Sequence, residues 1–182
     1  MKVLKENEVR QKRSLTLNEM MECQKTQPKT TYLWNGIKEK SFGLVFGPSK
    51  SGKTIFCENL AMSIAMGKRE FFGYQLDGIP KKVLFVGLEE FWQNRVERNI
   101  MQFEAMNEED QLPLGENYRF QPIDFTKRIV RDSDYNNLIE TIQDSEAEVV
   151  FIDSITRMNL GQLENSADSE KLMQRLRDVC DS

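Results

Sequence analysis

The segment Gly47-Pro-Ser-Lys-Ser-Gly-Lys-Thr54 constrains the fold more than any other part of this chain. The apolar run Phe42–Phe46 precedes it, and the helical run Ile55–Met66 follows it. Its two glycines and its Lys-Thr ending fit the pattern GxxxxGK[ST], which is informative only between a strand and a helix. That context is present here, so a chance glycine-rich turn is a poor explanation. We therefore expect a buried strand, a phosphate-binding loop and a helix, in that order.

The chemistry of this loop follows from its residue types. Its glycines let the backbone approach phosphate oxygens closely, and successive N–H groups form an anion nest at the positive end of the helix dipole. The Lys53 ammonium would neutralise the terminal phosphates, and the Thr54 hydroxyl would bind Mg²⁺. Lys50 is expected to face solvent more than substrate. The residues expected at the nucleotide are Gly47, Pro48, Ser49, Lys50, Ser51, Gly52, Lys53 and Thr54.

Short apolar runs alternate with helical patterns along the rest of the chain. Further strands are expected at Val83–Gly87, at Tyr118–Ile123 as an edge strand, and at Val149–Ile152. Further helices are expected at Leu15–Gln24, Phe91–Met106, Ser133–Ser145 and from about Ser166 to Cys180, with a polar loop over Asn107–Asn117. The helix Phe91–Met106 should turn Trp92 and Ile100 inward. This alternation predicts an α/β fold with a mostly parallel sheet flanked by helices.

Length and composition limit the class of protein. The chain has 182 residues, and we expect a polar arm at 1–14 and one domain at 15–182. Its net charge of −4 gives no general attraction to nucleic acid, so DNA binding would need a local patch or an assembled ring. It has no histidine, the commonest general base and metal ligand. Its three scattered cysteines and the absence of a long apolar run predict a cytoplasmic protein without membrane contact.

Carboxylates follow two of the expected strands. Asp153 ends the run Val149–Ile152, at the strand end where α/β sheets bind ligands, and could hold Mg²⁺ through water. Glu89 and Glu90 follow Val83–Gly87. One of them could orient the attacking water, or both could begin the next helix, where the helix dipole favours acids. Both interpretations hold if Glu89 lies in the site and Glu90 lies at the start of the helix.

Three other polar residues near these acids have less specific roles. Ser154 could contact the water shell of the metal or cap the turn, and the turn is slightly favoured. Arg95 and Arg98 lie one helical turn apart, and a solvated or salt-bridged surface position is the default for both.

Taken together, Gly47–Thr54, Leu88–Glu90, Arg98 and Val149–Ser154 resemble the RecA-like P-loop ATPase core. Among its branches, the chain is most similar to the one containing RepA-type plasmid replicative helicases, with DnaB-type helicases as more distant relatives. The resemblance implies ATP hydrolysis with Mg²⁺, with Glu89 as the catalytic base beside Lys53. It also implies a homo-oligomer, a hexameric ring that binds single-stranded DNA.

Two features depart from that family. Phe91-Trp92 stands where the family commonly has proline, and the C-terminal strands of the RecA-like core are not in the sequence, so an incomplete domain is expected. The missing strand would lie between the strand of the phosphate loop and the strand of Asp153. Two alternatives remain open at this point. One is a RecA-, RadA- or KaiC-like ATPase, and the other is a nucleotide-binding regulatory protein or DNA-binding adaptor without turnover.

Overall fold

The computed structural model describes residues 14–27, 31–121, 131–154 and 166–181. The chain divides into two units, residues 1–31 and 32–182, which are considered separately. The expected arm at 1–14 lies almost entirely outside the described residues, as do positions 122 and 123 of the expected edge strand. Among the described residues, no helix is long and apolar enough to cross a membrane.

The first unit contains one helix, α2 (Leu17–Thr26), among its described residues. Its start is a capping box: the Thr16 side chain accepts from the Glu19 backbone N–H, and the Glu19 side chain accepts from the Thr16 backbone N–H. This exchange satisfies two of the N–H groups that a helix start leaves without partners. The helix expected at Leu15–Gln24 is therefore confirmed, with boundaries two residues later.

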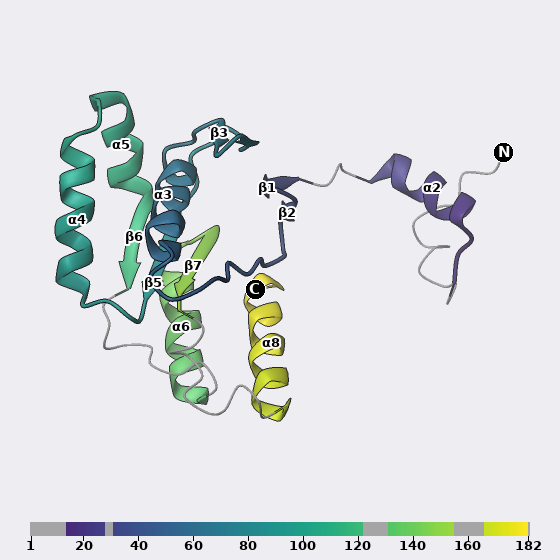
Figure 1. The fold of residues 1–182 in the computed structure, drawn as a ribbon. Coiled ribbons are helices and arrows are strands. Elements are labelled where there is room, and N and C mark those ends of the chain that lie inside the picture. The colour runs from purple at the N-terminus through teal and green to yellow at the C-terminus, as the bar shows by residue number, and fades with distance from the viewer. Residues whose placement is uncertain (1–13, 28–30, 122–130, 155–165, 182) are drawn as a thin grey trace. The chain divides into compact units, whose positions relative to one another are not determined.

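The second unit is built on a parallel sheet of three strands, β5 (Val83–Gly87), β6 (Tyr118–Gln121) and β7 (Val149–Asp153). The strand order is β6-β5-β7, so β6 lies at an edge as expected (Figure 1). All five residues of β5 are buried, as a central parallel strand covered on both faces requires. Gly87 is paired with Asp153, which brings the carboxyl ends of β5 and β7 side by side.

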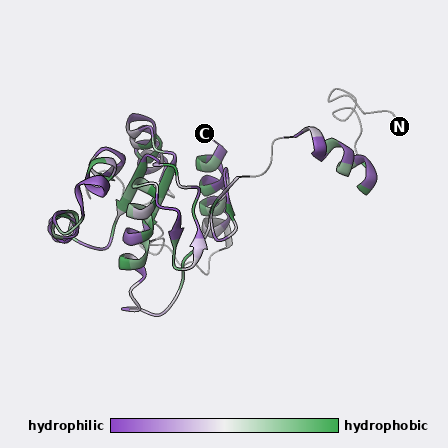
Figure 2. Cartoon of the chain, turned by 90° about the horizontal axis from the view of Figure 1, so that it is seen from above, coloured by the Kyte–Doolittle hydropathy of each residue, from purple (hydrophilic) through white to green (hydrophobic). Residues whose placement is uncertain are grey.

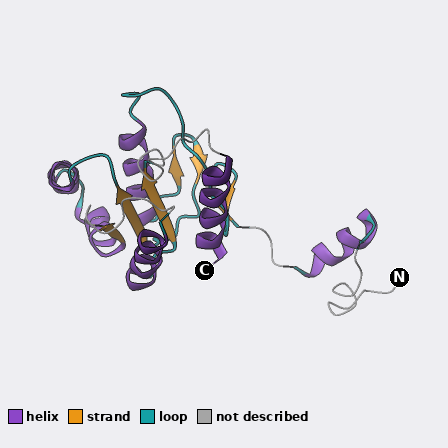
Figure 3. Ribbon diagram, turned by 90° about the horizontal axis from the view of Figure 1, so that it is seen from below, coloured by secondary structure: helices purple, strands orange, loops and turns teal. Residues whose placement is uncertain are grey.

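Helices cover both faces of this sheet (Figures 1 and 3). On one face, Val83 and Phe85 pack with α3 (Lys53–Ala65) and with Leu114 of α5 (Glu108–Asn117). On the other face, Leu84 and Val86 pack with α6 (Asp132–Ser145) and α8 (Ser166–Asp181). Successive side chains of a strand point to opposite faces, which explains why the strands are largely apolar in Figure 2. The structure is the α/β arrangement of a RecA-like P-loop core.

Two short antiparallel hairpins flank α3. They are β1 (Tyr32–Trp34) with β2 (Ile37–Lys38), and β3 (Glu70–Phe71) with β4 (Tyr74–Gln75). The Trp34 side chain is only 8% exposed, and its indole N–H donates to the Phe71 carbonyl at 3.0 Å. Trp34 therefore packs at the edge of the domain and joins the two hairpins.

The expected strand Phe42–Phe46 is wrong: the structure has no strand there. Leu44 and Val45 are half exposed, and Phe46 is 89% exposed. A strand is stabilised by a hydrogen-bonded neighbour. Among the described strands, β5 pairs with β6 and β7, and none pairs with this segment. The run has the composition of a buried strand, but no described strand pairs with it.

The expected polar loop at Asn107–Asn117 is also wrong, because this segment forms α5. Asn107 caps the helix by accepting from the Asp110 N–H at 2.8 Å, and three acids occupy the first turn, where the helix dipole favours them. These contributions outweigh Pro113 within the helix, whose presence led to the loop prediction.

The helix expected at Phe91–Met106 is present as α4 (Trp92–Glu104), but its inward face differs. Trp92 and Ile100 are 44% and 48% exposed, whereas Arg95 and Asn99 are buried. An apolar stripe normally faces the core. Here Glu58 on α3 draws Arg95 inward, while Phe103 of the stripe still packs against the core.

Candidate nucleotide site

The phosphate-loop segment leads directly into α3. Gly52 is the N-cap of α3 with φ +85°, in the left-handed region that glycine adopts without strain. No side chain caps the first turn of α3. The residues from Gly47 to Gly52 are exposed. A helix start whose N–H groups are not capped by a side chain is suited to binding an anion.

Lys53 lies against the loop that precedes it. Its ammonium donates to the carbonyl oxygens of Gly47 at 3.1 Å and Pro48 at 2.7 Å. The loop therefore folds around the charge that is expected to meet the terminal phosphates. Lysine binds phosphate as a point charge, so an anion reaching this loop would compete with two neutral carbonyls for the same ammonium.

Thr54 and Asp153 are in direct contact. The Thr54 hydroxyl donates to Asp153 Oδ2 at 2.8 Å. Asp153 is the last residue of β7 and is 9% exposed. Burial raises the pKa of its carboxyl above the ordinary value, and the Thr54 hydrogen bond and the charge of Arg95 oppose that shift only in part. A divalent cation here would therefore favour the ionised form.

Glu89 lies beside this pair. The Ser154 hydroxyl, one residue beyond Asp153, donates to Glu89 Oε1. The register of β5 and β7 explains the contact, because Gly87 is opposite Asp153 and both chains continue from the same edge of the sheet. The expected position of Glu89 at the strand ends, next to Asp153, agrees with this geometry. Ser154, for which a turn cap and a contact with the metal's water shell are both open, donates its hydroxyl to Glu89.

Glu90 is turned away from Glu89 by a different partner. Arg98 Nη1 and Nη2 donate to the two Glu90 carboxylate oxygens at 2.9 Å and 2.7 Å. This bidentate contact lowers the pKa of the Glu90 carboxyl. Phe91 is the N-cap of α4, so Glu90 precedes the helix, and its expected place in the first turn is wrong. The adjacent glutamates thus have separate surroundings, one beside Ser154 and one on Arg98.

A buried ionic network that the sequence analysis missed lies behind the site. Glu58 of α3 is fully buried and accepts from Arg95 Nε at 2.9 Å. Arg98 reaches the same carboxylate, with Nε and Nη2 at 3.0 Å and 2.8 Å from its two oxygens. The surface position expected for Arg95 is wrong, since this residue is only 2% exposed. One signal was available: Glu58 is the only acid in the largely apolar sequence of α3, and a buried acid requires a partner.

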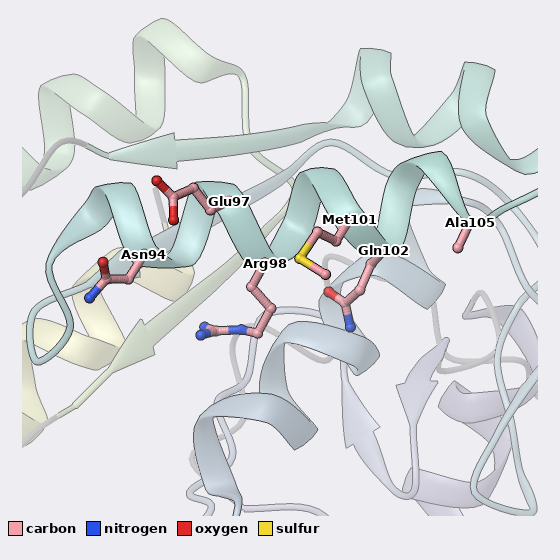
Figure 4. Close-up of a pocket in the computed structure, with 6 residues that line it drawn as sticks. All are labelled: Asn94, Glu97, Arg98, Met101, Gln102 and Ala105. Carbon is pink, nitrogen blue, oxygen red and sulfur yellow. The ribbon is translucent and has the colours of Figure 1, made fainter.

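The groove beside this network is distinct from the phosphate loop. It has a volume of about 530 Å³ and is lined by residues of α4 and its C-cap, including Arg98 and Gln102. Figure 4 shows the side chains of Arg98 and Gln102 extending from α4 toward α3. Thr54, Glu89 and Asp153 do not line it. The strand ends and the loop, rather than this groove, carry the expected chemistry.

The residues near the loop fit magnesium better than a metal held by protein alone. Among the described residues, no group of three or more acidic, cysteine or histidine side chains could hold a metal. The available ligands are the Thr54 hydroxyl and the Asp153 carboxylate, which are hard oxygen donors in contact with each other. Mg²⁺ prefers oxygen and is commonly held by one or two protein groups together with substrate phosphates and water.

Comparison with protein families agrees with this geometry. A family model described as an AAA domain matches residues 10–182. No curated protein matches the chain. The match spans nearly all of the sequence, including the loop, both strand-end carboxylates and the helices that carry the ionic network. It identifies an ATPase-like nucleotide-binding domain. The chain therefore belongs to the AAA domain family of P-loop ATPase-like proteins.

Proposed function

We propose that this chain binds ATP with Mg²⁺ at Gly47–Thr54 and that its site is arranged for hydrolysis of the terminal phosphate. The observation that carries the proposal is the contact between Thr54 and Asp153 at 2.8 Å. It joins the end of the phosphate loop to the end of β7. In this arrangement the two oxygen ligands would meet the same Mg²⁺, and the bound metal would offset charge on the phosphates.

The proposed mechanism assigns one task to each side chain. The loop N–H groups and the Lys53 ammonium bind the phosphates and stabilise the charge that develops on the transferred group. Glu89 orients a water molecule and accepts its proton as the water oxygen bonds to the terminal phosphorus. The bond from that phosphorus to the bridging oxygen breaks, and ADP and phosphate are the products. Ser154 supports Glu89 by donating to its Oε1 atom.

The resemblance to RepA-type and DnaB-type helicases supports a finer proposal about the biological role. In that proposal the domain couples ATP hydrolysis to movement on single-stranded DNA within a homo-oligomeric ring in the cytoplasm. The supporting observations are the order of Gly47–Thr54, Glu89, Arg98 and Asp153, together with the AAA domain match. A RecA-, RadA- or KaiC-like ATPase shares that order. Assays of DNA unwinding and of DNA strand exchange would distinguish a helicase from such an ATPase.

A nucleotide-binding adaptor without turnover is the second candidate. The unpaired segment Phe42–Phe46, whose residues Leu44–Phe46 are exposed, favours it, because the loop is then attached to backbone that no described strand holds in place. Catalysis requires reacting groups held in a defined geometry, whereas binding tolerates a looser loop.

Phosphate release by the purified chain distinguishes these two functions. For an ATPase, Glu89→Gln should lower the rate by about 10²–10⁴-fold while leaving ATP binding unchanged. Glu104→Gln, an exposed acid on α4, is the matched control and should keep the full rate. If ATP binds without phosphate release above background and Glu89→Gln changes nothing, the adaptor is the correct function.

A further inference from the structure

We propose that Arg95, supported by Glu58, is the positioning residue for Asp153, and so sets the affinity of the site for Mg²⁺. This inference rests on the proposed nucleotide site. It concerns a residue that the motifs do not include and that the sequence analysis placed on the surface.

The sheet leaves space for the Arg95 side chain at the end of β5. A Cβ atom added to Gly87 would lie 1.4 Å from Arg95 Nη1, so no larger residue fits beside this guanidinium. Gly87 is paired with Asp153, and the guanidinium therefore lies at the last residue pair of the two strands. Its carbon is 4.9 Å from the centre of the Phe85 ring, two residues earlier on the same face.

The hydrogen bonds of Arg95 are incomplete without Asp153. Its Nε donates to Glu58, but the buried Nη2 has no hydrogen-bond partner among the described residues. Nη2 lies 4.0 Å from Asp153 Oδ2, within ion-pair range but beyond a hydrogen bond. That oxygen also accepts the Thr54 hydrogen bond. A buried donor without an acceptor is costly, and the nearby carboxylate explains where this one is directed.

A purely structural role would account for only part of this arrangement. The Glu58–Arg95 pair alone would join α3 to α4, and an apolar pair of similar volume often replaces such a buried pair without loss of stability. Glu58 does not explain the direction of Nη2. Groups that orient a metal ligand without touching the metal commonly change metal affinity by about 10–100-fold when removed. Arg95 has that relation to Asp153.

The test separates the affinity for Mg²⁺ from the affinity for phosphate. Binding of a fluorescent ATP analogue is measured in chelator and then across a Mg²⁺ titration, for the unaltered chain and for Glu58→Met/Arg95→Met. The double replacement avoids leaving a lone buried charge. We expect the Mg²⁺ concentration at half-maximal effect to rise by about tenfold in the double variant. Affinity in chelator should stay within about twofold, because the loop and Lys53 are unchanged.

Two further variants keep the inference falsifiable if the double variant does not fold. Arg95→Lys retains the charge and should recover part of the Mg²⁺ response. Gly87→Ala should weaken the response in the unaltered background, because its methyl group displaces the guanidinium, and should add nothing where Arg95 is already replaced by methionine. A merely structural role would make Gly87→Ala lower the affinity in chelator and in Mg²⁺ by the same factor.

The outcomes distinguish this inference from the proposed function. If the unaltered chain binds no nucleotide with or without Mg²⁺, the proposed function fails, and the inference fails with it. If the unaltered chain shows a Mg²⁺-dependent gain and folded Arg95 variants show the same half-maximal concentration, only the inference is overturned. Equal losses in chelator and in Mg²⁺ would also overturn it, because they indicate general damage to the loop.

Discussion

The hydroxyl of Thr54 lies 2.8 Å from a carboxylate oxygen of Asp153, although the two residues are 99 positions apart in the chain. One residue belongs to the first turn of α3 and the other ends β7. The contact is a hydrogen bond between two groups that both suit Mg²⁺ as ligands. It therefore connects the phosphate loop with the sheet. A change at Asp153 should accordingly alter the Mg²⁺ dependence of nucleotide binding.

Asp153→Asn should remove the metal dependence of that binding. The amide oxygen still accepts the Thr54 hydrogen bond, but a neutral amide is a poor Mg²⁺ ligand. In chelator, nucleotide affinity should match that of the unaltered chain, and added Mg²⁺ should no longer increase it. Fluorescence titrations at fixed pH check both halves of this expectation. An undiminished Mg²⁺ effect in the variant would exclude Asp153 as a ligand.

The same variant should change how stability depends on pH. Burial raises the folded-state pKa of Asp153, so this group favours folding at low pH and loses that contribution as pH rises through its folded pKa. The replacing amide stays neutral throughout, and Asp153→Asn should melt at a higher temperature than the unaltered chain near neutral pH. The difference should shrink as the pH falls toward the ordinary pKa of an aspartate. Melting curves without Mg²⁺ measure this, and a variant that melts lower near neutral pH would refute the sign.

The buried network predicts that the effects of replacing Glu58 and Arg95 on the free energy of unfolding are strongly coupled. Glu58→Leu leaves the buried Arg95 without its acceptor and should lower the free energy of unfolding by about 3–5 kcal/mol. Glu58→Met/Arg95→Met should lose much less, because no lone charge remains. Denaturant unfolding of both variants, with Glu104→Gln as the surface control, provides the comparison. Similar losses in the single and double variants would mean that the two residues are not coupled.

In the unpaired segment Phe42–Phe46, by contrast, we expect a substitution to change the free energy of unfolding very little. Phe46 is 89% exposed, so Phe46→Ser should change the free energy of unfolding by no more than about 0.5 kcal/mol. Phe85 on the central strand is the matched control, and Phe85→Ala should cost about 3–5 kcal/mol. A loss from Phe46→Ser that approaches the Phe85 value would show that the segment is buried in solution.

The sequence predicted the parts of this fold that depend on local pattern. Continuous apolar runs identified β5 and β7, because strands covered on both faces are apolar throughout. The position of Asp153 after such a run placed it correctly at the sheet edge. These inferences needed only the nearest residues in the chain and the rule that parallel strand ends meet at one edge.

The errors arose where distant residues decide the outcome. The charge of Arg95 predicts a solvent-exposed side chain, but its burial depends on Glu58, which lies 37 positions earlier. The apolar run Phe42–Phe46 predicts a strand, but strand formation also needs a hydrogen-bonded partner. Pro113 favours a loop at Asn107–Asn117, but the Asn107 cap supports a helix there. The spacing of apolar residues does not show which side chains far apart in the sequence become partners.

The most direct test of the central claim is calorimetric titration of ATP and Mg²⁺ into the unaltered chain and into Lys53→Ala. Lys53 contacts the loop carbonyls of Gly47 and Pro48, where a bound phosphate would meet its charge. We predict one binding event for the unaltered chain, weakened by at least about tenfold in the variant because the phosphate loses its counter-charge. Both proteins should melt at similar temperatures without nucleotide. Equal affinity of the two proteins, or no binding by the unaltered chain, would contradict the account.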